Sequence, residues 1–245
     1  MATQLDLQEQ EQLDDLKHFW KQYGNLITWT LILTLSAFAA WYGWQARQRD
    51  QAMKAGAMYD ELERAADKGD AALASQIFNE LKDRYPSTAF AEQAGVLAAR
   101  VQFDKSGDKG NADNARAALT WVADHAIEPE YKTIARLRLA GVLMDTKQYD
   151  EALKQLDAAK GDKNFTALVD DRRGDVLLAQ GKKDEARTAY QAAWKAMEPS
   201  VGYRRLIDAK LTSLGADPSA SAASAAVATT TTDVAAKPTA AGSAP

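Results

Sequence analysis

The residues best suited to chemistry form one acidic cluster, Asp170, Asp171 and Asp175. If this stretch is helical, Asp171 and Asp175 share one face, and paired carboxylates can do acid–base work or hold a divalent cation. Arg172 and Arg173 interleave with them, no histidine is near, and the chain has neither a glycine-rich phosphate loop nor a G-x-S-x-G motif. Ion pairing along a helix surface explains these charges better than catalysis, so we predict no enzyme and no catalytic residue.

Metal, cofactor and nucleic-acid chemistry have equally little support in the sequence. The chain has no cysteine, which excludes disulfides, thiolate metal sites and a cysteine nucleophile. Its two histidines, His18 and His125, are far apart and are not expected to share a metal ion. Residues 47–215 contain 27 basic and 27 acidic residues, so this part is neutral and lacks the footprint of a nucleic-acid binder. We predict no metal, cofactor, small-molecule substrate or nucleic-acid partner.

An internal repeat organises the region that carries the acidic cluster. The segment "ARLRLAGVLMDTKQYDEALKQLDAAKG" begins at Ala135, and "VDDRRGDVLLAQGKKDEARTAYQAAWK" begins at Val169, 34 residues later. This period is typical of tetratricopeptide repeats, in which each unit is a pair of antiparallel helices. Small residues at Ala140 and Gly174 allow close helix approach, while Leu156 and Tyr190 fill the space between the helices. Two aspartates are placed to cap the second helices, Asp150 and Asp184.

Weaker copies of the repeat lie upstream. Ala118 in "NARAALTWVADH" lies 34 residues before Ala152, at the position expected in a second helix. Ala74 in "GDAALASQIFNELKDRYP" lies 44 residues before Ala118, and the ten residues beyond one period form a polar loop, "DKSGDKGNAD", at 104–113. We therefore predict four helical hairpins from about residue 51 to 198 and a closing helix within 199–215. Such hairpins stack into a superhelix with a concave and a convex side, so the fold class is all-α.

A groove on the concave side is the candidate protein-binding site. The first helix of each clear repeat turns alternate positions toward this side, and an apolar groove with a few carboxylates suits an extended or helical peptide. The same residues could equally pack against the neighbouring hairpin or the closing helix. The candidate groove residues are Ile134, Leu137, Gly141, Met144, Asp145, Leu168, Asp171, Asp175 and Leu178.

The stretch "NLITWTLILTLSAFAAWYGWQ" predicts a transmembrane helix over residues 25–46. The 25 positions between Lys21 and Arg47 are uncharged, which is enough to cross a hydrocarbon core of about 30 Å. Ala37-Phe38-Ala39 matches a signal-peptide cleavage pattern, but the preceding segment is acidic and the apolar run continues beyond the motif. The segment is therefore expected to be a permanent anchor. Aromatic residues suited to the headgroup zone lie at both ends: Trp20, Tyr23, Trp29, Trp41, Tyr42 and Trp44.

Charge alone leaves the orientation of this anchor open. Two basic residues precede the span, and four follow it closely. The positive-inside rule then leans toward a cytoplasmic C-terminal part, but the rule is weak when a long domain follows. The basic residues concerned are Lys17 and Lys21 before the span, and Arg47, Arg49, Lys54 and Arg64 after it.

The ends of the chain complete the predicted organisation. Residues 216–245 read "ADPSASAASAAVATTTTDVAAKPTAAGSAP", which has too little apolar surface to offset the cost of ordering, so we predict a disordered tail. The predicted parts are a short segment over 1–24, the transmembrane helix over 25–46, the repeat domain over 47–215 and the tail over 216–245.

Beyond the generic repeat, the chain resembles the YfgM family of ancillary SecYEG translocon subunits. The resemblance covers nearly everything through Leu214, including "LKHFWKQYGN", "AGAMYDELERA", "RLRLAGVLMDTKQYDEALKQLD" and the terminal "AKLTSLG"; its most specific stretch is "VDDRRGDVLLAQGKKDEAR". It implies a single-pass protein of the bacterial inner membrane, with a cytoplasmic N-terminus and a periplasmic tetratricopeptide-like domain. It also implies association with SecYEG and with a PpiD-type membrane-anchored periplasmic chaperone, and a role in handing exported chains to periplasmic chaperones. The alanine-, serine- and threonine-rich tail departs from the compact ending expected of the family.

Two interpretations follow for what the protein does. In the first, the repeat domain is a membrane-tethered binding module. In the second, the protein is a structural membrane subunit in which the span makes the key contact, because Ala39 and Gly43 form a small-xxx-small pair. Co-purification with the span alone or with the soluble domain alone distinguishes them.

Overall fold

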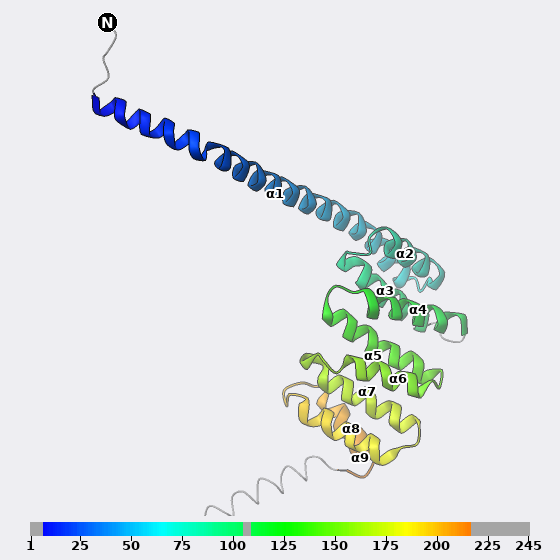
Figure 1. The fold of residues 1–245 in the computed structure, drawn as a ribbon. Coiled ribbons are helices and arrows are strands. Elements are labelled where there is room, and N and C mark those ends of the chain that lie inside the picture. Colours follow the sequence, from blue (N-terminus) through cyan, green and yellow to red (C-terminus); the bar gives the residue numbers. More distant parts are fainter. Residues whose placement is uncertain (1–6, 105–108, 217–245) are drawn as a thin grey trace, which may run out of the picture. The chain divides into compact units, whose positions relative to one another are not determined.

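The computed structural model describes residues 7–104 and 109–216, and all the regular elements in these ranges are helical (Figure 1). This confirms the predicted all-α fold. The chain divides into two compact units, residues 1–54 and 55–245. In chain order the helices are α1 (Leu7–Asp67), α2 (Ala71–Arg84), α3 (Ala89–Asp104), α4 (Lys109–His125), α5 (Pro129–Asp145), α6 (Tyr149–Ala159), α7 (Thr166–Ala179), α8 (Lys183–Ala196) and α9 (Arg204–Ser213), with a short 3₁₀ turn at Lys163–Phe165.

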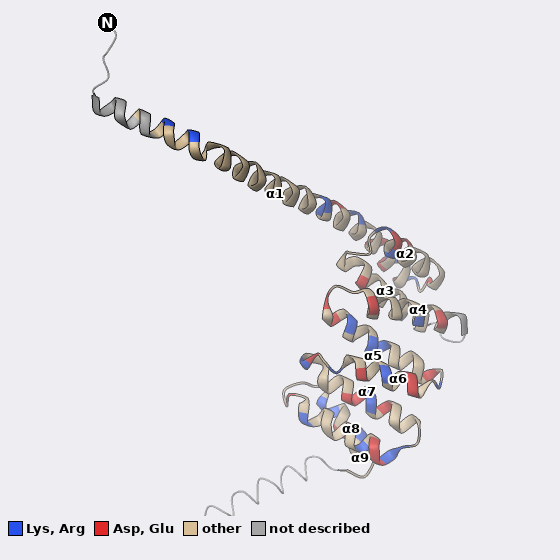
Figure 2. Ribbon diagram, viewed as in Figure 1, with Lys and Arg blue, Asp and Glu red and all other residues tan. Residues whose placement is uncertain are grey.

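Helix α1 contains the predicted span and continues well beyond it. Its 61 residues are helical from Leu7 to Asp67, so no break marks the predicted boundary at residue 47. Figure 2 shows a long stretch of α1 without any charged residue. The span's large apolar side chains are exposed, as expected for residues that meet lipid; Leu33, for example, is 70% exposed.

The second unit consists of stacked hairpins. The pairs α3/α4, α5/α6 and α7/α8 follow one another, and α9 packs against α8. The end of α1 belongs to this unit, since Leu62 is fully buried and the Tyr59 ring lies 5.8 Å from that of Phe90 on α3. One apolar core runs from Ala55 to Val176, and a second, around Tyr190, joins α7 and α8 to α9.

Two glycines mark close approaches between the helices of a hairpin, and one of them, Gly174, is a predicted small residue. A Cβ added at Gly174 on α7 would overlap the ring of Tyr190 on α8. Gly95 on α3 has the same relation to Val122 on α4. Val122 lies one 34-residue period before Leu156 and two before Tyr190.

Helix ends follow the repeat as well. Gly181 (φ 80°) and Lys147 (φ 61°), one period apart, adopt the left-handed conformation after α7 and α5. In each case the next amide donates to a carbonyl five residues back, Lys182 to Leu177 at 3.0 Å and Gln148 to Leu143 at 2.7 Å. This is the Schellman arrangement that ends a helix and reverses the chain.

Two local predictions were wrong. Asp150 and Asp184 do not cap their helices, because α6 begins at Tyr149 and α8 at Lys183, in each case one residue earlier. Both aspartates therefore lie in the first turn, where a negative charge is stabilised by the helix dipole. The polar segment at 104–113 is not a loop throughout, since α3 ends at Asp104 and α4 begins at Lys109. The predicted tail from residue 217 onward lies outside the described residues.

Candidate protein-binding surface

The first helices of the hairpins form an open cleft. Helix α5 contacts both α3 and α7, and between them lies a hollow of about 510 Å³. We call it the arginine cleft, because Arg100, Arg138 and Arg172 line it beside a single carboxylate, Asp145. The rest of its lining is apolar or small: Ala99, Phe103, Leu119, Gly141, Val142 and Met144.

The structure brings three of the nine predicted groove residues, Gly141, Met144 and Asp145, to this cleft. Four others do not line it: Leu178 is 36% exposed, and the remaining three are half-buried, Ile134, Leu137 and Leu168. A role in binding stays a prediction for all of them. The last two of the nine, Asp171 and Asp175, have partners within the chain, described below.

The arginines of the cleft were missed as binding residues. Arg138 and Arg172 are 34 residues apart and hold the same position in successive repeats, so the period itself contains the signal. Arg172 Nη1 lies 3.7 Å from Asp175 Oδ2, and Arg100 Nε lies 3.6 Å from Asp104 Oδ2. Arg138 donates through Nη1 to the Val96 carbonyl at 3.3 Å.

The charge of Arg138 is the least compensated of the three. Burial lowers the pKa of its guanidinium, and the nearby positive charge of Arg100 lowers this pKa further. No carboxylate within the described ranges forms an ion pair with Arg138. Guanidinium groups remain protonated in proteins, so the cleft carries this charge permanently.

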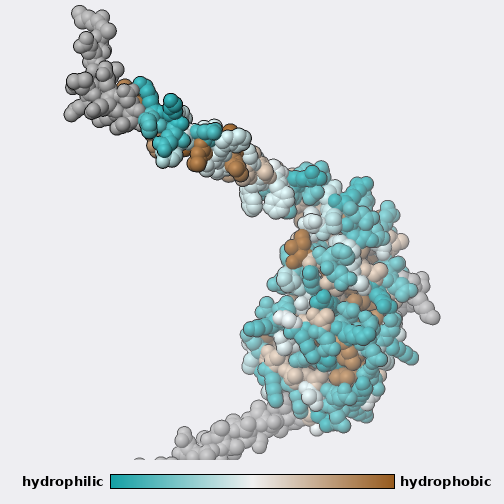
Figure 3. All heavy atoms as spheres, viewed as in Figure 1, coloured by the Kyte–Doolittle hydropathy of each residue, from teal (hydrophilic) through white to brown (hydrophobic). Residues whose placement is uncertain are grey.

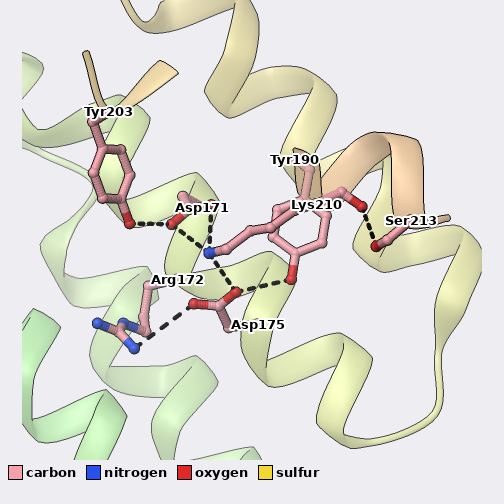
Figure 4. Close-up of polar contacts among 7 residues, drawn as sticks. All are labelled: Asp171, Arg172, Asp175, Tyr190, Tyr203, Lys210 and Ser213. Atoms are coloured by element: carbon pink, nitrogen blue, oxygen red, sulfur yellow. Dashed lines mark hydrogen bonds and ion pairs between the residues drawn. The ribbon is translucent and has the colours of Figure 1, made fainter. Parts of the chain in front are cut away.

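The acidic cluster has a different role from the one predicted. Lys210 Nζ on α9 lies between two carboxylates of α7, 2.9 Å from both oxygens of Asp171 and 2.7 Å from Asp175 Oδ1 (Figure 4). The hydroxyl groups of Tyr203 and Tyr190 donate to Asp171 and Asp175, each at 2.8 Å. The two contacts of Lys210 join α9 to α7 across 39 and 35 residues, so the prediction of charges paired along one helix surface was wrong for Asp171. Asp175 does pair along α7, with Arg172 at 3.7 Å, and with Lys210 as well.

Burial explains why these charges must be paired. Asp171 is only 2% exposed, and a buried carboxylate is costly without a cation and hydrogen-bond donors. Burial also raises the pKa of both tyrosines, Tyr190 and Tyr203, and their hydrogen bonds to the aspartates raise it further. The network therefore fastens α9 to α7.

Arg173, beside the acidic cluster, also joins two helices. Arg173 Nη2 lies 2.6 Å from Asp157 Oδ1 on α6, and hydrogen bonds from Lys160 and Arg173 lower the pKa of Asp157. Burial raises the pKa of Asp170, although Arg173 and Lys160 act in the opposite direction. Among the described residues, no group of three or more histidines, cysteines, aspartates or glutamates is arranged to hold a metal ion.

The two units differ in surface character. In the part of the chain that the structure describes, one helix is long and apolar enough to cross a membrane, and it lies near the N-terminus. Figure 3 shows strongly hydrophobic residues along α1 and a mainly hydrophilic surface on the hairpins.

Comparison with known proteins defines the class first. The family model of the tetratricopeptide repeat-like domain matches residues 17–216, which include both the span and the hairpins. Among solved structures, the chain aligns with MamA AMB-1 at 19% identity and a TM-score of 0.42, over 66% of this chain and 84% of that one, a likeness too low to support any inference.

The curated relatives define the family. This chain is 34% identical to the ancillary SecYEG translocon subunit of Neisseria gonorrhoeae, over 85% of this chain and 98% of the relative. It is 32% identical to the subunit of the same name from Escherichia coli, over 76% of this chain and 87% of the relative. It is 28% identical to that of Haemophilus influenzae, over 76% of this chain and 89% of the relative. The chain belongs to the family of ancillary SecYEG translocon subunits. This family and the one N-terminal apolar helix fit a single-pass protein of the inner membrane.

Proposed function

We propose that this protein associates with the SecYEG translocon and binds polypeptide through the open side of its hairpin domain, as a non-enzymatic module. The observation that carries the proposal is the cleft between α3, α5 and α7, which is open, has an apolar floor and lies in a domain tied to a membrane helix. The names of the relatives support the partner. A membrane tether raises the local concentration of the cleft near the translocon, so weak contacts suffice.

The proposal places the hairpin domain in the periplasm and the N-terminus in the cytoplasm. Its support is the family, against the slight lean of the basic residues around the span toward the opposite orientation. A reporter fused after Gly215 that requires periplasmic oxidation is expected to be active. A reporter active there only in the cytoplasm would overturn this topology.

Within the periplasm, the proposed role is to link exported chains to chaperones, with a PpiD-type membrane-anchored chaperone as direct partner. Because the chain has no cysteine, single cysteines introduced at Met144, Asp145 or Leu178 act as unambiguous crosslinking positions. Crosslinks to the chaperone or to an arrested export intermediate are expected from the open side.

Capture by substituted full-length protein tests the binding surface. Met144→Glu places a charge in the apolar floor of the cleft and should weaken retention of translocon-associated chains, whereas Thr120→Glu adds the same charge at an exposed position of α4. Both variants are compared after their thermal melts show that they are folded. Equal capture by both would move the site away from the cleft.

A second candidate is a structural subunit whose span makes the main contact. One face of the span presents polar side chains, Gln22, Asn25, Thr30 and Thr34, beside Leu26 and Leu33. The two threonine hydroxyls donate to carbonyls four residues back at 2.8 Å, and polar faces of this kind favour helix–helix association in membranes. Recovery of SecYEG with residues 1–54 alone, and not with the hairpin domain, would favour this candidate.

A further inference from the structure

The charges around the arginine cleft are unevenly distributed within a domain that is neutral as a whole. Three guanidinium groups and one carboxylate line the cleft, whereas residues 47–215 contain equal numbers of basic and acidic residues. The adjoining hollow between the end of α1 and α3, of about 530 Å³, shares Arg100 but is lined by three carboxylates, Glu63, Asp67 and Asp104. The open side therefore has a positive part at α5 and α7 and a negative part next to it.

The positive part is incompletely neutralised by the chain itself. Asp104 pairs with Arg100 at 3.6 Å, but both side chains are about two-thirds exposed, so this pair is weak. Asp175, the neighbour of Arg172 at 3.7 Å, is held more closely by Lys210 at 2.7 Å. Arg138 has a carbonyl as its hydrogen-bond partner and the cation Arg100 beside it.

The floor between these cations is apolar. Phe103, Val142 and Met144 come from α3 and α5 and line the cleft together with the arginines of α3, α5 and α7. Guanidinium groups bind carboxylates in a planar, two-pronged geometry, and an apolar floor excludes water from such contacts. A free inorganic anion would use the cations but not the floor, whereas a peptide with acidic and apolar side chains uses both.

We propose that the arginine cleft selects polypeptide segments in which acidic side chains lie next to apolar ones. This rests on the proposed function, because it names the class of segment that the open side binds. Arg138 and Arg172 receive the carboxylates, and the floor at Met144 receives the apolar side chain. The carboxylates at Glu63, Asp67 and Asp104 repel the same segment, which confines it to the α5 and α7 part of the surface.

The test is binding of labelled synthetic peptides to the full-length protein in detergent, measured by fluorescence anisotropy. The first peptide contains aspartate, glutamate, leucine and phenylalanine. A second has amides in place of the carboxylates, and a third keeps the carboxylates but has serine in place of leucine and phenylalanine. The first is expected to bind tightest, and its affinity should fall as salt is raised.

Substitutions then assign the charge. Arg138→Gln and Arg172→Gln should each weaken binding of the first peptide by about three- to tenfold, and together by more. Arg84→Gln is the matched control, because Arg84 is exposed on α2 and pairs with Glu80 at 2.9 Å, away from the cleft. Arg138→Lys should retain part of the affinity, since it keeps the charge but loses the planar fork.

The outcomes separate this inference from the proposed function. If the amide peptide binds as tightly as the acidic one, and the arginine variants are unchanged, selection by charge is wrong while peptide binding by the open side stands. If the serine peptide competes as well as the apolar one, the cleft is only an anion site, and the inference is also wrong. If none of the peptides binds, both the inference and the proposed binding role fail.

Discussion

Replacing Gly174 by alanine should destabilise the hairpin domain, although alanine is the better helix former. A Cβ at this position of α7 would overlap the Tyr190 ring, which is 1% exposed and held by its hydrogen bond to Asp175. Overpacking a core costs about 1–3 kcal/mol, and alanine returns up to about 1 kcal/mol of helix propensity. We expect a net loss of about 1–2 kcal/mol, or roughly 2–8 °C in the melting temperature of a domain of this size.

Gly141→Ala provides the matched control within the same fold. Gly141 also lies inside a helix, but the nearest atom to its added Cβ is Arg172 Nη1 at 3.9 Å, which is ordinary contact. This variant should be neutral or more stable by up to about 1 kcal/mol. Thermal unfolding of both variants, followed by circular dichroism, gives the comparison.

A double-mutant cycle decides whether the Tyr190 ring is the cause. The preceding repeat has Ala140 and Leu156 at the equivalent positions, both fully buried, so a smaller partner accommodates alanine. Tyr190→Leu lowers stability by itself, but in that background Gly174→Ala should cost little or nothing. If Gly174→Ala costs the same in both backgrounds, or if it melts like Gly141→Ala, the steric explanation is refuted.

Three further predictions concern other parts of the domain. Lys210→Met leaves the buried Asp171 without its cation and should lower the free energy of unfolding by about 3 kcal/mol. Hydrogen exchange should become faster in α9 before it does in the other helices. An unchanged melting temperature would show that the network does not stabilise the domain. Lys147→Gly removes the cost of about 1 kcal/mol that a residue other than glycine has in the left-handed conformation, so it should raise stability. Gly181→Ala, one period later, should lower stability for the same reason. Equal shifts of both melting temperatures in one direction would contradict this explanation. Burial raises the pKa of Glu92, so its carboxyl group holds a proton more tightly in the native state than in the unfolded chain, and the contribution of Glu92 to stability falls as pH rises above about 4.5. Thermal melts should therefore show Glu92→Gln gaining stability relative to the parent between pH 4 and pH 7. A stability difference that does not change with pH would refute the assignment.

The sequence predicts the frame of the repeat domain well because packing between helices depends on residue size at fixed spacing. Residue size in the repeat predicts that Gly174 allows two helices to approach and that Tyr190 fills the space between them, and the structure places the two in contact. Helix starts are predicted less well, as Asp150 and Asp184 show. An aspartate at the second residue of a helix is stabilised by the helix dipole, and an aspartate at the N-cap is stabilised by a hydrogen bond to the backbone. The residue type alone therefore does not distinguish the two positions.

The partners of the acidic cluster could not be predicted from local sequence. Arg172 and Arg173 interleave with these aspartates and suggest pairing along α7, which Arg172 makes with Asp175. The cation that both Asp171 and Asp175 share, Lys210, comes instead from α9. Which of several distant lysines meets a buried carboxylate depends on how the closing helix docks. That docking also buries Ile207 and Leu211 in the second apolar core, and their contacts carry no signal about charge.

The geometry of a single helix explains why the arginines face the open side, although no packing requirement selects their charge. Arg138 and Arg172 each precede by two positions the small residues Ala140 and Gly174, and two positions correspond to about 200° around a helix axis. A small residue that faces the second helix of its own hairpin therefore places the arginine on the opposite, open side. Packing requires a small residue at Ala140 and Gly174 but no particular side chain at Arg138 and Arg172. The charge of the open side can therefore be adapted to the partner that binds there without a change in the fold.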